Sequence, residues 1–144
     1  MADRIVVASD HAAVEMRQAV VAHLKERGID VVEMGLAIGE RTDYPKQGRA
    51  AAERVASGDC TSGILLCGTG QGIMMAANKV PGIRCGVCGD TFSAAMIRAH
   101  NDANMLSLGA RVIGEGLALR IVDAFLDTAF EGGRHADRVS MIEG

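Results

Sequence analysis

The residues best suited to chemistry fall in one stretch, residues 64–78, which reads ILLCGTGQGIMMAAN. A short apolar run ends at Cys67, a loop with glycines at 68, 70 and 72 follows, and an apolar helix is expected after it. The first N–H groups of a helix have no partner inside it, and glycines let a ligand approach the backbone closely. The stretch therefore predicts a cradle for a phosphate or a developing oxyanion, with a thiol at its mouth. The alternative is a purely structural turn.

Two further pairs of residues could transfer protons or bind an anion. Asp10 and His11 follow an apolar run near the start of the chain, and His100 and Asn101 end a predicted helix. Each pair also has a structural interpretation. An aspartate often caps the start of a helix, and a histidine is favoured at a helix C-terminus.

Three arginines are candidate phosphate ligands, because the guanidinium group binds phosphate through paired hydrogen bonds. Arg134 and Arg138 are four residues apart, so on a helix they would share one face. Arg111 follows a predicted strand. The alternative for the first two is a solvated tail, since residues 131–144 are mostly polar.

The elements that must position these residues alternate between strands and helices. Strands are predicted at 4–9, 29–34, 63–67, 83–88 and 104–109, with a helix after each and a polar tail from 131. Since hairpin turns do not join the strands, we expect a parallel sheet with helices on both faces. This is a Rossmann-like three-layer α/β sandwich, and residues 1–144 form a single domain. Ligands of such sheets bind beyond the carboxyl ends of the strands, where we expect the following residues: Asp10, His11, Cys67, Thr69 and Arg111, with His100 and Asn101 nearby.

Composition narrows the classes of protein. The net charge is −3, Trp is absent, and there are one Tyr and three Phe, so we expect neither nucleic acid nor an anionic membrane as a partner. The start of the chain resembles no signal peptide and no apolar window approaches 18 residues, so a cytoplasmic protein is expected. The four cysteines are read as reduced thiols, with Cys85 and Cys88 in the core, and His23 as a packing or solvated histidine.

The motifs for a metal and for a dinucleotide are weak. Zinc needs three or four protein ligands, and Cys or His residues do not cluster at ligand spacing, so no metal is expected. Ile73 stands where a dinucleotide-binding loop would have its third glycine.

Six motifs together resemble one family of sugar-phosphate isomerases, the RpiB/LacAB family, which includes the type B ribose-5-phosphate isomerases. The motifs are SDHA at 9–12, ERTDYP at 40–45, LCGTGQG at 66–72, AANKVPGIR at 76–84, AHNDANMLSLGARVIG at 99–114 and EGGRH at 131–135. They span almost the whole chain in the same order. The resemblance implies a Rossmann-like fold, no metal or other cofactor, and a homodimer, sometimes a tetramer, whose sites combine residues of both subunits. The C-terminal segment from about 131 would reach the partner.

The resemblance also implies a role for each site residue. Cys67 would move a proton between C1 and C2 of the sugar, with Thr69 beside it and the amides of the loop stabilising a cis-enediolate. Asp10 would shuttle protons among the sugar oxygens, and His100 would assist ring opening while Asn101 holds the substrate. The remaining residues would bind the substrate, the histidine and arginines through its phosphate: His11, Tyr44, Gly68, Gly70, Gln71, Gly72, Arg111, Arg134 and Arg138.

One branch of the family uses a glutamate just after the glycine loop as its base. Here that position is Ile73, which cannot accept a proton, so Cys67 is the expected base. A helix N-terminus and nearby cations favour a thiolate there.

The expected reaction interconverts ribose 5-phosphate and ribulose 5-phosphate. Allose, galactose and erythrulose phosphates remain alternative substrates, because Ala13 and Gln71 depart from the commonest family residues. The alternative functions are a non-catalytic phosphate- or nucleotide-binding module and a silent subunit of a hetero-oligomer.

Overall fold

Five parallel strands form the centre of the structure, a computed structural model that describes residues 3–144. Their order across the sheet is β2-β1-β3-β5-β4, and every neighbouring pair is parallel. The strands are β1 (Arg4–Ser9), β2 (Asp30–Met34), β3 (Ser62–Cys67), β4 (Cys85–Val87) and β5 (Met105–Gly109). The predicted parallel sheet is confirmed.

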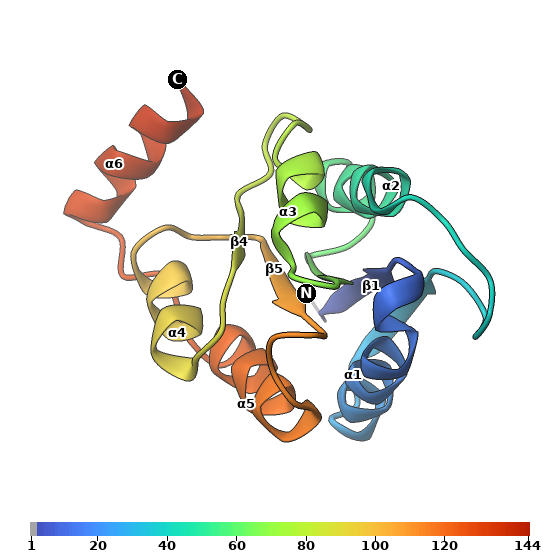
Figure 1. The fold of residues 1–144 in the computed structure, drawn as a ribbon. Coiled ribbons are helices and arrows are strands. Elements are labelled where there is room, and N and C mark those ends of the chain that lie inside the picture. Colours follow the sequence, from blue (N-terminus) through green and yellow to red (C-terminus); the bar gives the residue numbers. More distant parts are fainter. Residues whose placement is uncertain (1–2) are drawn as a thin grey trace.

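Helices cover both faces of the sheet (Figure 1). They are α1 (Val14–Glu26), which follows a short 3-10 turn at His11–Ala13, α2 (Tyr44–Ala56), α3 (Gln71–Ala77), α4 (Thr91–Ala99), α5 (Glu115–Leu126) and α6 (Arg134–Glu143). Residues of α1, α4 and α5 pack in one hydrophobic core and residues of α2 and α3 in a second core. The three-layer Rossmann-like sandwich is therefore confirmed.

The apolar runs of the strands divide between the two cores by alternation. In β3, Ile64 and Leu66 lie in the core beneath α1, α4 and α5, whereas Leu65 and Cys67 lie in the core beneath α2 and α3. Successive side chains of a strand point to opposite faces, and both faces of this sheet are buried. This explains why the strands read as continuous apolar runs rather than as an apolar–polar alternation.

The predicted strand boundaries hold to within one residue except for the fourth strand. The fourth strand is shorter than predicted, since β4 covers three residues, and α2 begins at Tyr44, with Pro45 in its first turn. Proline suits that position because its missing N–H would have no partner there.

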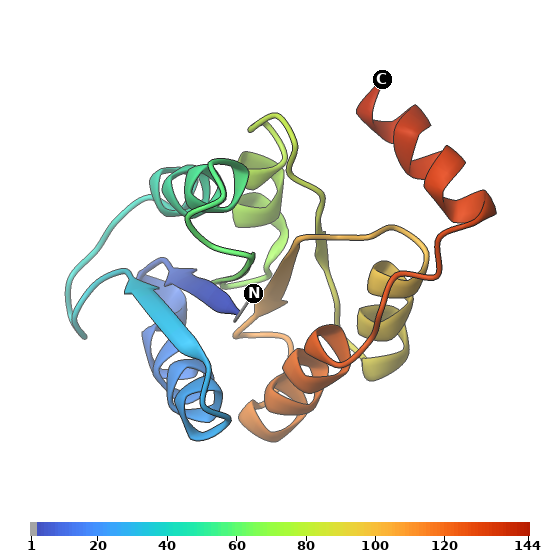
Figure 2. The ribbon, with the colours of Figure 1, turned by 180° about the vertical axis from the view of Figure 1, so that it is seen from behind.

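The prediction of a tail after residue 131 was wrong, because residues 134–143 form α6. Figure 1 and Figure 2, which are opposite views, both show α6 standing clear of the sheet beyond the end of α4. Its single buried residue is His135, and the large apolar side chains of Met141 and Ile142 are 77% and 61% exposed. A helix gains most of its stability from packing an apolar face, and these two apolar side chains of α6 are not packed within residues 3–144.

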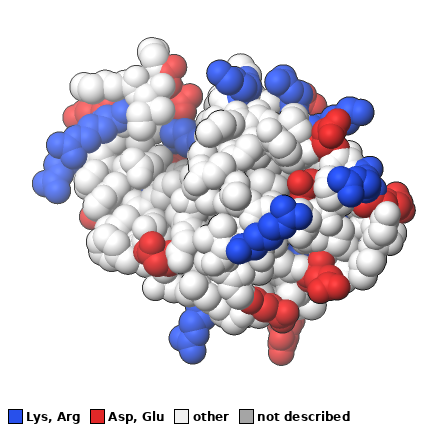
Figure 3. Space-filling model, in the orientation of Figure 1, with Lys and Arg blue, Asp and Glu red and all other residues white. Residues whose placement is uncertain are grey.

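No helix among residues 3–144 combines the length and apolar character that a membrane span requires. In the view of Figure 3, basic and acidic side chains are interspersed over the face that is shown.

Candidate active site

Cys67 is the last residue of β3, and its side chain is fixed by the loop that follows. The N–H of Gly70 donates to Cys67 Sγ over 3.2 Å, and Cys67 is only 5% exposed. Gly70 has a φ of 79°, and a Cβ there would lie 2.9 Å from the carbonyl carbon of Leu108. Positive φ and this close contact with β5 both require glycine. The thiol therefore sits at the start of α3, as the sequence predicts.

Two hydroxyl groups, those of Thr69 in the loop and Ser107 in β5, hold the rest of the loop by hydrogen bonds. Thr69 Oγ1 accepts a hydrogen bond from the N–H of Gln71 over 3.2 Å, which leaves its hydroxyl hydrogen to donate elsewhere. Ser107 Oγ, buried in β5, donates to the carbonyl oxygen of Gly70 over 2.6 Å. Two of the loop amides are thus already used within the loop, those of Gly70 and Gln71.

Tyr44 and Arg111 flank the two ends of the loop. The ring of Tyr44 occupies the space that a side chain at Gly72 would need. The N–H of Arg111 donates to the carbonyl oxygen of Gly68 over 3.0 Å, and a Cβ at Gly68 would lie 3.3 Å from its guanidinium. The structure therefore brings together the thiol, the glycine loop, one aromatic ring and one cation.

Asp10 and His11 lie beside the same edge of the sheet. The N–H of Asp10 donates to the carbonyl oxygen of Leu66 over 3.2 Å, which joins the ends of β1 and β3. Its carboxylate accepts from the N–H of Ala12 over 2.9 Å, so Asp10 is an N-cap whatever else it does. His11 Nδ1 lies 3.0 Å from the carbonyl oxygen and 3.4 Å from the backbone nitrogen of Thr42, so the backbone just before α2 holds this edge of the ring.

Ile73 is fully buried in the core beneath α2 and α3. The side chain of Ile73 therefore does not line the loop. The start of α3 has no carboxylate at position 73, and the Cys67 thiol lies beside the loop.

The sequence analysis missed Arg17, a buried guanidinium close to this edge. Arg17 is 4% exposed and donates to Ser9 Oγ over 2.8 Å, to Glu33 Oε2 over 3.0 Å and to the carbonyl oxygen of Leu36 over 2.6 Å. These bonds tie the ends of β1 and β2 to the segment between β2 and α2. That segment ends at Tyr44, and His11 contacts it at Thr42. The available signal was Ser9, a polar residue at the end of the apolar run of β1 that is fully buried and accepts from Arg17.

His100 and Asn101 do not lie near Cys67, which corrects the sequence prediction. Asn101 accepts from Arg84 Nε through its carbonyl oxygen over 3.0 Å, and Arg84 comes directly before β4. The end of α4 is therefore at the amino ends of the strands, whereas Cys67 is at the carboxyl end of β3. A strand of this length spans roughly 17–20 Å. The prediction failed because α4 runs back along the whole depth of the sheet.

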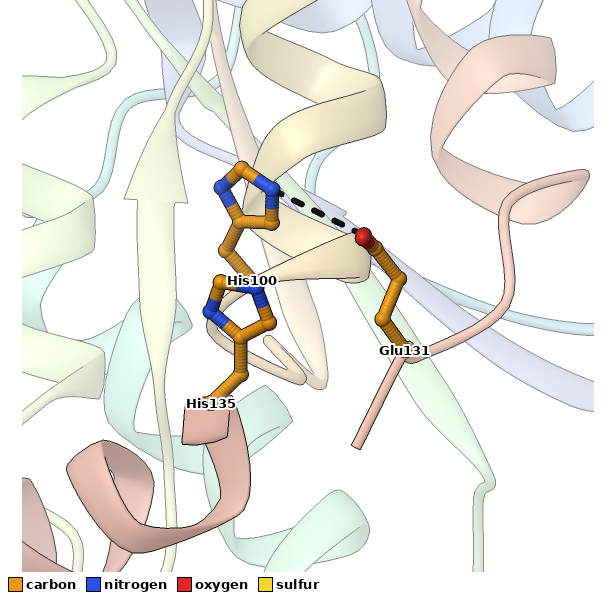
Figure 4. A group of neighbouring side chains, drawn as sticks. All are labelled: His100, Glu131 and His135. Carbon is orange, nitrogen blue, oxygen red and sulfur yellow. Dashed lines mark ion pairs between the residues drawn. The ribbon is translucent and has the colours of Figure 1, made fainter. Parts of the chain in front are cut away.

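Residues of α6 gather around His100 instead. The rings of His100 and His135 stack with centroids 4.3 Å apart and planes inclined by 10°, and His100 Nε2 lies 3.7 Å from Glu131 Oε2 (Figure 4). Burial, followed by the charges of His100 and Arg134, lowers the pKa of His135. Arg134 and Arg138 are exposed on the same helix. One chain therefore carries two separate groups of predicted site residues.

The group His100, Glu131 and His135 also offers three potential metal-ligand atoms within 4.8 Å of one another. The sequence showed no such cluster, because the two histidines are 35 positions apart. Nitrogen lone pairs lie in the plane of an imidazole ring. The two stacked rings are nearly parallel, so their lone pairs lie in parallel planes. The two histidines therefore do not direct their lone pairs at the same ion position.

His23, Cys85 and Cys88 lie in surroundings that are typical of residues with a structural role. Cys85 and Cys88 are free and buried, and burial raises the pKa of both thiols, that of Cys88 to about 11. His23 Nε2 lies 2.7 Å from Asp123 Oδ1 between α1 and α5. The predictions of core thiols and of a packing histidine are confirmed.

The known proteins that are similar to this chain are sugar-phosphate isomerases, and the similarity covers nearly the whole chain. A family model described as Ribose/Galactose Isomerase matches residues 5–142. Ribose-5-phosphate isomerase B of Escherichia coli (strain K12) is 48% identical over 139 residues, which cover 96% of this chain and 93% of that protein. D-erythrulose-4-phosphate isomerase of Pectobacterium atrosepticum is 41% identical over 139 residues, covering 96% and 91%. A solved structure of ribose-5-phosphate isomerase B from Clostridium thermocellum superposes with a TM-score of 0.95 at 50% identity, covering 97% of this chain and 95% of that one.

Proposed function

The chain belongs to the ribose/galactose isomerase family, and we propose that it interconverts ribose 5-phosphate and ribulose 5-phosphate. The reaction moves one proton between C1 and C2 through a cis-enediolate and needs no cofactor in this proposal. The observation that carries it is the Cys67 thiol at the mouth of the glycine loop, with the N–H of Gly70 directed at its sulfur.

Cys67 is the proposed base, and the loop is the proposed oxyanion site. A thiolate that removes the proton from C2 of the open-chain aldose leaves one negative charge, which forms on O1 beside the hydroxyl at O2. The Thr69 hydroxyl can donate to that charge, because its oxygen already accepts from the N–H of Gln71. The amides of Gly70 and Gln71 are engaged within the loop, so the other amides of residues 68–72 are the proposed further donors.

The proposed roles of the other residues follow from their chemistry. Asp10, which is 6% exposed beside the end of β3, would move protons among the sugar oxygens. Tyr44 would close one side of the pocket. His11 and Arg111 would bind the phosphate from the same chain, together with Arg134 and Arg138 from α6 of a second copy.

A second copy is required by this proposal, because His100 and Cys67 are at opposite edges of the sheet in one chain. In a symmetric dimer each copy would supply Cys67 to one site and His100, Asn101, Arg134 and Arg138 to the other. The exposed apolar side chains of α6 support such a contact. A homodimer in the cytoplasm is therefore part of the proposal, and a tetramer built from two such dimers would keep the same sites.

The same chemistry on a four-carbon sugar phosphate is the second candidate. It is favoured by the 41% identity to an erythrulose-4-phosphate isomerase. The length of the bound sugar would distinguish the two candidates, since the enediolate and phosphate ends of the site are held by different residues.

A kinetic panel tests the proposal directly. The purified chain is assayed with ribose, allose and galactose phosphates and with erythrulose 4-phosphate, each with and without a chelator. The highest kcat/KM on ribose 5-phosphate, unchanged by the chelator, is expected. Cys67→Ala should remove turnover while inorganic phosphate still protects the chain against thermal unfolding. Near-normal activity of that variant would contradict the assignment of the base, and loss of wild-type activity on chelation would contradict the metal-free reaction.

A further inference from the structure

His100 is held by the side chains of Glu131, which precedes α6, and of His135, which lies in the first turn of α6. Its ring stacks on His135 with 4.3 Å between centroids, and its Nε2 lies 3.7 Å from Glu131 Oε2. Figure 4 shows that the carboxylate lies at the edge of the ring that carries Nε2, while the other ring nitrogen, Nδ1, points away from it. One face and one edge of the ring are therefore occupied, and Nδ1 is left open.

Glu131 is fixed to α4, and His135 is fixed by the turn before α6 and by burial of its side chain. The N–H of Glu131 donates to the carbonyl oxygen of Ala99 over 3.0 Å, at the last residue of α4 and directly before His100. The N–H of His135 donates to the carbonyl oxygen of Gly132 over 3.1 Å, and the side chain of His135 is buried. Arg84 links the far end of α6 to the strands through Glu143 over 2.7 Å. The segment thus holds a defined position against His100.

The charges around the pair differ for the two rings. Burial is the main cause that lowers the pKa of His135, and the charges of His100, Arg134 and Arg138 add to it while Glu131 opposes it. Two stacked imidazoles repel each other when both are protonated. His135 is therefore the buried ring with the lowered pKa, whereas the ring of His100 is 41% exposed and has the Glu131 carboxylate beside its Nε2.

We propose that Glu131 and His135 are positioning residues that hold His100 for opening of the sugar ring. Glu131 engages Nε2 and His135 fixes the plane of the ring, so that Nδ1 faces the ring oxygen of a sugar bound by the second copy. The inference rests on the proposed function, because it concerns the step that precedes enolisation.

The step balances without a further reactant. The proton on Nδ1 passes to the ring oxygen O4 of the furanose as the C1–O4 bond breaks, and the electron pair of that bond remains on O4. The hydroxyl at C1 loses its proton to Asp10, and the C1–O1 bond becomes the aldehyde carbonyl. His100 is then neutral, and Cys67 can remove the proton from C2.

A comparison of cyclic and acyclic substrates tests this assignment. Ribose 5-phosphate must be opened, whereas ribulose 5-phosphate and erythrose 4-phosphate cannot form a furanose because their phosphates occupy the hydroxyl that would close it. Glu131→Gln and His135→Ala should each lower kcat on ribose 5-phosphate by about tenfold, below the ~10²–10⁴ that general acid–base catalysis contributes. Deuterium entry at C1 of ribulose 5-phosphate, or turnover of erythrose 4-phosphate, should change less than about twofold, because neither needs the acid that opens a ring.

Two further variants separate positioning from folding. His135→Phe keeps a flat ring for stacking and should restore most of the lost kcat, while Asp137→Asn, an exposed change on the same helix, should have no effect. Equal losses on cyclic and acyclic substrates, or no loss on either, would overturn the inference. If the wild-type chain processes neither kind of substrate, it is the proposed function that fails.

Discussion

Cys67 and His100 lie at opposite edges of the same sheet, one at the carboxyl end of β3 and the other where α4 returns to the amino ends of the strands. A single chain cannot bring a base and a ring-opening acid together across that depth, roughly 17–20 Å. Two chains related by a two-fold axis can do so twice, once in each site.

Mixing two inactive variants should therefore restore activity. Cys67→Ala and His100→Ala each disable every site of their own dimer, but a mixed dimer has one site that contains both native residues. Co-expression or refolding of an equal mixture should recover about a quarter of the wild-type activity, since about half of the dimers are mixed and one of their two sites is intact. The assay is turnover of ribose 5-phosphate after the mixture is purified. A mixture as inactive as its parents would show that the two residues act in one chain.

Gly70→Ala should damage both stability and turnover. The residue has a φ of 79°, and its Cβ would meet β5 at 2.9 Å. Strain and overpacking together should cost about 2–4 kcal/mol of unfolding free energy, and displacement of the N–H from Cys67 Sγ should lower kcat. Gly58→Ala is the matched control, since Gly58 has a φ of 85° but open space around its Cα. It should cost about 1 kcal/mol and leave kcat unchanged. Equal effects in urea titrations of the two variants would contradict the packing argument.

Arg17→Met should destabilise the fold by about 2–4 kcal/mol, because it leaves Glu33 and the carbonyl oxygen of Leu36 without their buried donor. Urea titration measures the change. Arg49→Met, at an exposed position of α2, should change the free energy by less than about 0.5 kcal/mol. The segment before Tyr44 depends on Arg17, so KM for the substrate should rise in Arg17→Met as well. A loss of stability no larger than in the control would refute this role.

The contribution of Asp123 to stability should depend on pH. Burial alone would raise its pKa, but hydrogen bonds from His23 and Arg27 outweigh burial, and the pKa of Asp123 is lowered. The folded state therefore binds fewer protons than the unfolded state, and the stabilisation is present above the unfolded pKa of a carboxyl, about 4, and is lost as the pH falls below it.

Asp123→Asn should cost about 0.5–1 kcal/mol at pH 7, a modest amount because the side chain is 38% exposed and solvent screens the pair. The difference between variant and wild type should shrink toward zero near pH 3, where both are measured by thermal unfolding. Asp137→Asn on α6 is the control and should show no such trend. A difference that persists unchanged at pH 3 would exclude the ionic explanation.

The sheet and the half-site around Cys67 could be predicted from the sequence because they depend on local patterns. Three sequence patterns each indicate the local structure around them: the continuous apolar runs, the glycines after Cys67 and the polar residues at strand ends. The partners of His100 could not be predicted in this way. Its contacts with Glu131 and His135 join segments more than 30 positions apart, and the packing of α4 along the sheet decides where they meet.

The same reasoning explains the error over α6. Its sequence is mostly polar and was therefore interpreted as a solvated tail, although its few apolar residues gather on one face of the helix. Arg17 was missed for a related reason, since an arginine on a helix is usually solvated and only the tertiary structure shows its three hydrogen-bond acceptors.

The contact between Tyr44 and Gly72 restricts the order in which the pocket can evolve. The outer atoms of the ring at 44 occupy the space of a side chain at 72, so a lineage that enlarges residue 72 first must also move the ring of Tyr44. A lineage that shrinks residue 44 first opens space that residue 72 can then take. The contact therefore couples the two positions, and a side chain at 72 is accommodated most easily where residue 44 is smaller.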